Sequence, residues 1–203
     1  MTLTSLLSFS LFAFMAALTP GPNNLMLAAS GANFGFYRSL PHIFGICIGF
    51  GLLVIAAGLG LGSFLHIFPQ IFFFLKYIAL LFLFYLVWKI ATAASPKFSQ
   101  NAKLMSLQTA ALFQWVNPKG ITVVISAITA YLDAASNIWQ ALPIMLFIFI
   151  LMTAIGTSLW TWLGSIISVH LSNTKQRIIF NYCMATALLI SMLPAILSIG
   201  DST

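Results

Sequence analysis

The stretch at residues 17–26, "ALTPGPNNLM", interrupts an otherwise continuous apolar run from residue 4 to residue 28. Proline lacks a backbone N–H and clashes with the preceding helical turn, so Pro20 and Pro22 predict a break in the helix. A break frees carbonyl groups on one side and N–H groups on the other. In lipid, irregular backbone persists only where it is buried in protein or lines an aqueous cavity. The stretch therefore predicts a broken transmembrane helix with a polar centre.

The composition is that of a membrane protein. Hydrophobic residues make up 61% of the 203 positions, the mean hydropathy is +1.07, and only 5% are charged, whereas about a quarter of a soluble domain is charged. Each of six apolar segments is long enough to cross a hydrocarbon core of about 30 Å. They are expected at residues 4–28, 40–62, 70–91, 107–131, 139–166 and 178–199. The first is read as a helix and not a signal peptide, because residues 1–10 carry no Lys or Arg.

Basic residues gather in alternate connections between these segments. The formal charge of +6 is spread over helix ends and forms no stripe for nucleic acid. By the positive-inside rule, the first, third and fifth connections face the cytoplasm. Their basic residues are Arg38, then Lys89, Lys97 and Lys103, then Lys175 and Arg177. Both termini are therefore predicted to face outward.

The longest polar stretch, residues 93–106, divides the chain into halves 1–92 and 107–203 of one transmembrane domain. With three spans each, the halves enter the bilayer from opposite sides, as in an inverted repeat. The fourth segment contains its own break, "NPKG" at residues 117–120. The predicted fold is all-α, with six transmembrane helices in two inverted three-helix halves, of which the first and fourth are broken. Counted from the segment starts, the breaks lie about 17 and 10 residues in, so their depths match only approximately.

Paired Gly/Pro breaks in corresponding helices point to a transporter's substrate site. The helix that follows Pro22 would present free N–H groups and a positive dipole end to a carboxylate. Carbonyls near Ala17 and Leu18 could hold an ammonium group. As alternatives, each Asn could be an ordinary helix cap, and each break a kink that binds nothing. The candidate substrate-binding residues are Pro20, Gly21, Pro22, Asn23, Asn24, Asn117, Pro118 and Lys119.

Lys119 is a charged residue deep in an apolar segment, which costs on the order of 3 kcal/mol unless it has a partner. The chain has no Glu, and its two acidic residues are Asp133 and Asp201. The remaining partners are carbonyls freed by the break or the carboxylate of a substrate. A structural cap and a substrate contact both stay open, as does a displaced helix end.

The candidates for proton coupling are His42 and Asp133, because histidine titrates near neutral pH and carboxylates are scarce here. His66 and His170 lie in or beside connections. Asp133, at a helix end, could equally be a solvated surface residue.

Two further residue pairs have structural interpretations. Gly45 and Gly49 are spaced one helical turn apart, which favours a close helix contact over a binding element. Cys47 and Cys183 are single cysteines in apolar helices, expected to be small buried side chains. No metal-binding or cofactor motif is evident.

These motifs resemble those of the LysE/RhtB family of amino-acid exporters. The resemblance runs from end to end and is most specific at residues 18–50 and 113–120. It is carried by "TPGPNN" at 19–24 with Gly35, Arg38, Gly45 and Gly49, by Lys76, Tyr77, Tyr85, Trp88 and Lys89, and by Asn117-Pro118-Lys119. "TPGPNN" together with "WKIA" at 88–91 resembles the branch that exports cysteine and O-acetylserine. The resemblance implies a six-helix inner-membrane carrier driven by the proton gradient. Many members carry an acidic residue after the second glycine of the pair, where this chain has Phe50.

The predicted function is secondary export of small neutral amino acids: cysteine or O-acetylserine, or homoserine- or threonine-like compounds. Its partners would be the amino acid, protons and the lipid bilayer, with homo-oligomerisation left open. No enzymatic activity is expected. The alternatives are a non-transporting membrane assembly factor, which needs no aligned breaks, and a membrane thiol-electron carrier, which needs paired cysteines.

Overall fold

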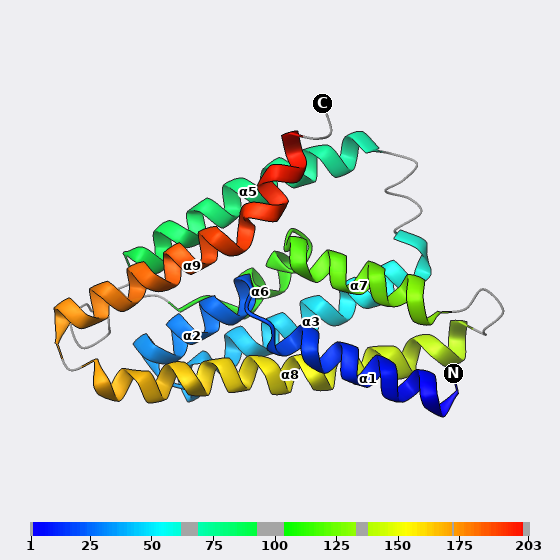
Figure 1. The fold of residues 1–203 in the computed structure, drawn as a ribbon, viewed down its shortest axis with the longest axis horizontal. Helices are drawn as coiled ribbons and strands as arrows, with labels where there is room; N and C mark the ends of the chain where they lie inside the picture. The colour runs from blue at the N-terminus through cyan, green and yellow to red at the C-terminus, as the bar shows by residue number, and fades with distance from the viewer. Residues whose placement is uncertain (1, 62–68, 93–103, 133–137, 172, 201–203) are drawn as a thin grey trace.

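The computed structural model describes residues 2–61, 69–92, 104–132, 138–171 and 173–200. Every regular element in these ranges is a helix (Figure 1). The first half contains α1 (Leu3–Leu18), α2 (Pro22–Phe34), the short η1 (Tyr37–Ser39), α3 (Leu40–Ala56), η2 (Ala57–Leu61) and α5 (Pro69–Ala91). The second contains α6 (Leu107–Phe113), α7 (Pro118–Tyr131), α8 (Ile138–His170) and α9 (Thr174–Gly200). The all-helical prediction is thus confirmed for the described residues.

The first predicted break is present. Helices α1 and α2 are bent by 53° at the break. Pro22 is the first residue of α2, where its missing N–H costs no helical bond. Gly21 before it is extended, with φ −175° and ψ 179°. Helix α2 continues through Gly31 to Phe34, six residues beyond the predicted end at 28, and ends at Gly35, whose φ of 83° is not helical.

The second predicted break is also present, and its backbone differs from the first. After α6 the chain continues through tight turns, in which the N–H groups of Gln114, Trp115 and Val116 donate to carbonyls three residues earlier. Helix α7 then begins at Pro118, again with proline at its first position. The boundaries 107 and 131 predicted for the fourth segment agree with those of α6 and α7.

Among the described residues, two helices are long and apolar enough to cross a membrane, Tyr37–Gly60 and Ile138–His170. The bent pair α1 and α2 makes a third candidate if it counts as one span. The described part of the chain therefore supports two to three spans by length and composition. Outward-facing leucines on α1 fit a lipid environment, since Leu3, Leu7 and Leu11 recur every four residues and are 62–72% exposed.

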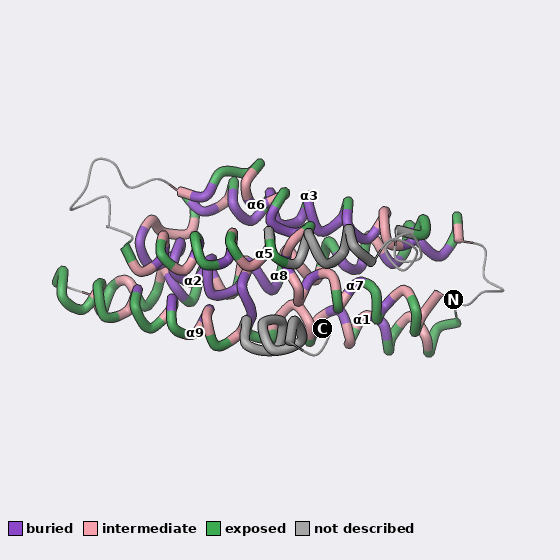
Figure 2. Tube along the Cα trace, turned by 90° about the horizontal axis from the view of Figure 1, so that it is seen from above, coloured by how far each residue is buried: buried purple, intermediate pink, exposed green. Residues whose placement is uncertain are grey.

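Helix α8 is the central support of the bundle. The α1–α2 pair packs along it, α3 lies between α8 and α6, and α5 packs on α9, which also contacts α2. Figure 2 shows buried backbone through α2, α3 and α8, and exposed residues along the outer faces.

Glycines allow the central helices to touch backbone to backbone. A Cβ atom added to Gly31 would lie 2.0 Å from the carbonyl oxygen of Thr161, and one on Gly164 would lie 2.1 Å from that of Ala28. At these two positions the backbones of α2 and α8 are in close contact. Small residues permit such close approach between membrane helices.

The predicted close contact at Gly45 and Gly49 is confirmed. Cβ atoms at these positions would lie 2.3 Å from the Leu107 carbonyl oxygen and 2.2 Å from that of Ala111. Helix α3 therefore holds α6, the short helix that precedes the second break.

Candidate substrate site at the two helix breaks

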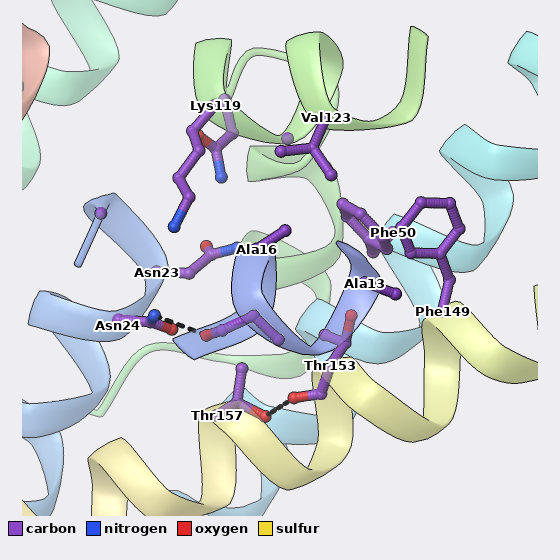
Figure 3. Close-up of a pocket in the computed structure, with 14 residues that line it drawn as sticks. Ala13, Ala16, Asn23, Asn24, Phe50, Lys119, Val123, Phe149, Thr153 and Thr157 are labelled. Atoms are coloured by element: carbon purple, nitrogen blue, oxygen red, sulfur yellow. Dashed lines mark hydrogen bonds between the residues drawn. The ribbon is translucent and has the colours of Figure 1, made fainter. Parts of the chain in front are cut away.

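A cavity lies where the two breaks meet (Figure 3). Its volume is about 50 Å³, enough for a few water molecules. Five of the eight predicted binding residues line it, whereas the three prolines shape the breaks beside it. The lining residues are Ala13, Ala16 and Ala17 of α1, Gly21, Asn23 and Asn24 at the first break, Phe50 of α3, Asn117, Lys119, Gly120 and Val123 at the second, and Phe149, Thr153 and Thr157 of α8.

The carbonyl end of α1 is bonded to protein donors. The Asn24 amide nitrogen donates to the carbonyl oxygens of Ala17 and Thr19, at 2.8 and 2.9 Å. The Trp160 indole nitrogen donates to the Leu18 oxygen at 3.1 Å. The Ala17 and Leu18 carbonyls, which the sequence offered as acceptors for an ammonium group, thus already accept from protein donors in this conformation, and ammonium binding there stays a prediction. A helix end inside protein needs such partners, and side chains from α2 and α8 supply them.

Lys119 connects the two breaks. Its ammonium group donates a hydrogen bond to the carbonyl oxygen of Thr19, and its side chain extends from α7 toward the start of α2 (Figure 3). Gly21 provides the space for it, because a Cβ atom there would lie 2.6 Å from Lys119 Cδ. In this conformation Lys119 thus caps the carbonyl end of α1, one of the three interpretations that the sequence left open.

A second polar bridge joins the same two breaks. The Asn23 amide donates to Gln114 Oε1 at 2.8 Å, and the Gln114 amide donates back to Asn23 Oδ1 at 3.2 Å and to the Ala110 carbonyl at 2.8 Å. Gln114 is fully buried. Sequence reasoning missed Gln114, although a glutamine in an apolar segment three residues before Asn117 was a usable signal.

Two helix N-termini face the cavity. The first backbone bonds of α2 and α7 run from Leu25 N–H to the Gly21 oxygen and from Ile121 N–H to the Asn117 oxygen, each 3.0 Å. Helical geometry gives the N–H groups of the two residues before each donor no partner within the helix. Neither helix has a side-chain cap on these groups. Both positive dipole ends are therefore directed at one cavity, an arrangement that favours an anion.

Asn117 carries an unused acceptor in the cavity wall. Its side-chain oxygen Oδ1 is buried and has no hydrogen-bond partner, and the residue is 2% exposed. A buried acceptor without a donor costs about 1–3 kcal/mol. An N–H donor that reached this oxygen would recover that free energy.

The far wall of the cavity is aromatic. Phe50 and Phe149 meet edge to face with ring centroids 5.4 Å apart, and Phe9 packs on Phe149 at 4.9 Å. Beside them, Thr157 donates its hydroxyl to the Thr153 carbonyl at 2.6 Å. Phe50, at the position where the family resemblance implies an acidic residue, is thus part of an apolar wall.

Of the predicted proton-coupling residues, the structure describes His42, which does not line this cavity. His42 in α3 is 2% exposed, and both ring nitrogens are buried without a partner, but it is not a lining residue. Asp133 and His66 lie outside the described residues. His170 is the last residue of α8.

The two cysteines form no disulfide. Cys47 in α3 is buried as expected, whereas Cys183 in α9 is exposed, contrary to expectation.

Within the described residues, no group of three or more His, Cys, Asp or Glu could hold a metal ion.

Comparison with known proteins agrees with this geometry. The model of the LysE type translocator family matches residues 14–194. The chain belongs to the LysE family. Its similar relatives include proteins named cysteine/O-acetylserine efflux protein from Escherichia coli strain K12 and Shigella sonnei strain Ss046, each 30% identical over 158 residues, covering 77% of this chain and 79% of the relative. That from Escherichia coli O157:H7 is 29% identical over the same length.

No solved structure matches the chain. Family membership identifies this LysE protein as a membrane transporter rather than an enzyme, and its relatives support amino-acid export.

Proposed function

We propose that the protein is a secondary transporter that exports small neutral amino acids through the cavity between the two breaks. Family membership and the names of the efflux relatives support amino-acid export. The single observation that carries the site is the convergence of two helix N-termini and an unused Asn117 oxygen on one cavity.

The chemistry of the cavity matches a zwitterion. The carboxylate would bind the free N–H groups at the starts of α2 and α7, with the amides of Asn23 and Asn24 nearby. The α-ammonium group would donate to Asn117 Oδ1. A short side chain would rest against Phe50 and Phe149. Because the described residues that line the cavity include no carboxylate, they offer no counter-charge to a cationic side chain, so cysteine, O-acetylserine or a homoserine- or threonine-like compound suits the cavity better.

A cavity of about 50 Å³ is smaller than a bound amino acid, so substrate entry requires the breaks to separate. The contacts that hold them together are the Lys119–Thr19 and Asn23–Gln114 hydrogen bonds. We assign this conformation to a closed state of the carrier, and opening to the loss of these bonds.

The six-span inverted topology remains our proposal, and the depth of the breaks supports it. The start of α1 and the end of α7 lie at the same end of the molecule (Figure 1), and Phe9 contacts Tyr131 with ring centroids 5.3 Å apart. From that end, 16 residues of α1 and 14 of α7 lead to the breaks, or about 24 and 21 Å at 1.5 Å per residue. The two segments start at opposite ends of the molecule, so offsets of 17 and 10 residues from their starts are compatible with breaks at a similar depth.

We further propose that residues 93–106 face the cytoplasm, that both termini face outward in a bacterial inner membrane, and that export is coupled to proton entry. The distribution of basic residues supports the orientation.

The test compares amino-acid release from bacteria loaded with mixed dipeptides. Cells expressing the protein should release one or a few small neutral amino acids, cysteine or O-acetylserine among them, faster than cells with an empty vector. Asn117→Ala should abolish the gain. Asn173→Ala, at an exposed position in the α8–α9 connection, should keep it at matched membrane levels. Release equal to the empty vector would contradict export and favour the assembly-factor alternative.

A further inference from the structure

Lys119 is the one titratable side chain among the described residues that line the cavity. The other described lining residues are alanines from α1, Gly21 and two asparagines at the first break, Asn117, Gly120 and Val123 at the second, Phe50 from α3, and Phe149 with two threonines from α8. None of these accepts or releases a proton at physiological pH. A carrier that exchanges protons for substrate at this site therefore has one candidate within it.

The position of the Lys119 ammonium group is the position that a substrate ammonium group would require. It donates to the Thr19 carbonyl, and the unused Asn117 oxygen belongs to a residue two positions earlier in the same cavity wall. Both acceptors suit the α-ammonium of an amino acid equally well. The substrate brings its own carboxylate, but its ammonium group and that of Lys119 are like charges that would compete for the same two acceptors in a cavity of about 50 Å³. Substrate and a protonated Lys119 should therefore exclude each other.

We propose that Lys119 carries the coupling proton, an inference that rests on the proposed export function. In the closed, empty carrier the protonated side chain holds Thr19. On the cytoplasmic side Lys119 gives its proton to water, the neutral amine leaves the carbonyl, and the zwitterion binds. On the outer side the zwitterion leaves, and Lys119 takes a proton from water and closes the breaks again. One proton enters for each amino acid exported, and no carboxylate is needed.

His42 is the competing candidate, since its ring is buried and unpartnered. It lies outside the cavity lining, so a substrate would not displace its proton directly.

The test is the pH dependence of L-cysteine and O-acetylserine binding to the purified full-length protein in detergent. Release of one proton per bound substrate should tighten the dissociation constant about tenfold per pH unit between pH 5.5 and 7.5. Lys119→Met should bind with an affinity that does not vary with pH. Lys119→Arg, which keeps its charge, should bind at least tenfold more weakly at every pH. Lys89→Met, the matched control on α5, should retain the wild-type slope.

A flat wild-type profile with measurable binding, or a pH slope retained in Lys119→Met, would overturn the inference while leaving the proposed export function intact. Loss of the slope in His42→Asn, with Lys119→Met unchanged, would move the proton to His42. If the wild-type protein binds neither compound at any pH, the proposed substrate and this inference both fail. Thermal unfolding of each variant identifies a folding defect. A misfolded site would weaken binding in both Lys119→Met and Lys119→Arg, whereas loss of the titrating group alone should weaken binding only in Lys119→Arg.

Discussion

The two helix breaks share a plan but differ in how their polar groups are satisfied. Each is followed by a helix with proline at its first position and no side-chain cap. At the first break the freed carbonyls of α1 are bonded to Asn24, Trp160 and Lys119. At the second, the backbone closes on itself in tight turns, and Asn117 keeps an unused oxygen.

This difference indicates that the first break is structurally fixed and that the second supplies the contacts that would change during transport. The first is a corner held in place by side chains from three other elements. The second supplies both bridges that reach across, Gln114 to Asn23 and Lys119 to the Thr19 carbonyl. We therefore expect damage to the first break to disturb folding, and damage to the second to disturb transport more than stability.

The largest effect should come from Asn24→Leu, which removes the amide donor from the Ala17 carbonyl, whereas the Thr19 carbonyl keeps Lys119. At about 1–3 kcal/mol for a polar group that loses its partner, the free energy of unfolding should fall by up to about 3 kcal/mol. Denaturation in mixed micelles, followed by circular dichroism, measures this. Asn173→Leu at an exposed helix cap should cost about 1 kcal/mol. Equal losses in the two variants would mean that the first break is not the fixed corner.

The next largest effect should come from Gly49→Ala, which tests the support of the second break. The new Cβ would lie 2.2 Å from the Ala111 backbone oxygen, so α6 must move, at about 1–3 kcal/mol. Gly51→Ala on the same helix meets only the flexible end of Ile150, at 3.1 Å. It should change the free energy of unfolding by less than about 1 kcal/mol. The same micelle titration compares them, and a similar cost for both would show that backbone contact does not hold α6.

A smaller effect is expected for the bridge between the breaks. Asn23→Leu, Gln114→Leu and the double variant form a double-mutant cycle for the unfolding free energy. Hydrogen bonds between membrane helices are worth about 0.6 to 1.7 kcal/mol, so the coupling should fall in that range. Transport should fall more than stability, because the bridge closes the cavity. Zero coupling would show that the bridge does not form.

The smallest effect should be that of Thr19→Val. The Thr19 hydroxyl donates to the Met15 carbonyl on an exposed side chain, so its loss should cost about 0.5 kcal/mol or less. The backbone oxygen that Lys119 contacts is retained, and amino-acid release should stay at the wild-type rate. A large loss of release here would show that the hydroxyl, and not the carbonyl, is the functional group.

The local elements of this protein could be read from the sequence because proline and glycine act locally. Pro22 and Pro118 start α2 and α7 as predicted, since proline cannot continue a helix but fits its first position. The contact of Gly45 and Gly49 with a neighbouring helix followed from their spacing. Five residues of the cavity lining could be predicted because they are a glycine and polar side chains at helix breaks inside apolar segments. Polar groups at such positions are unfavourable in a membrane unless they have a partner.

What the sequence determined, then, was the membrane class, the positions of both breaks and the polar residues beside them, all of which depend on neighbours along the chain. Which carbonyl meets which donor was decided only by the tertiary structure. The deciding hydrogen bonds join residues 91 or more positions apart: Trp160 with Leu18, Gln114 with Asn23, and Lys119 with Thr19. Such partners depend on how helices rotate and pack against one another, and glycine contacts along α8 and α3 set that packing.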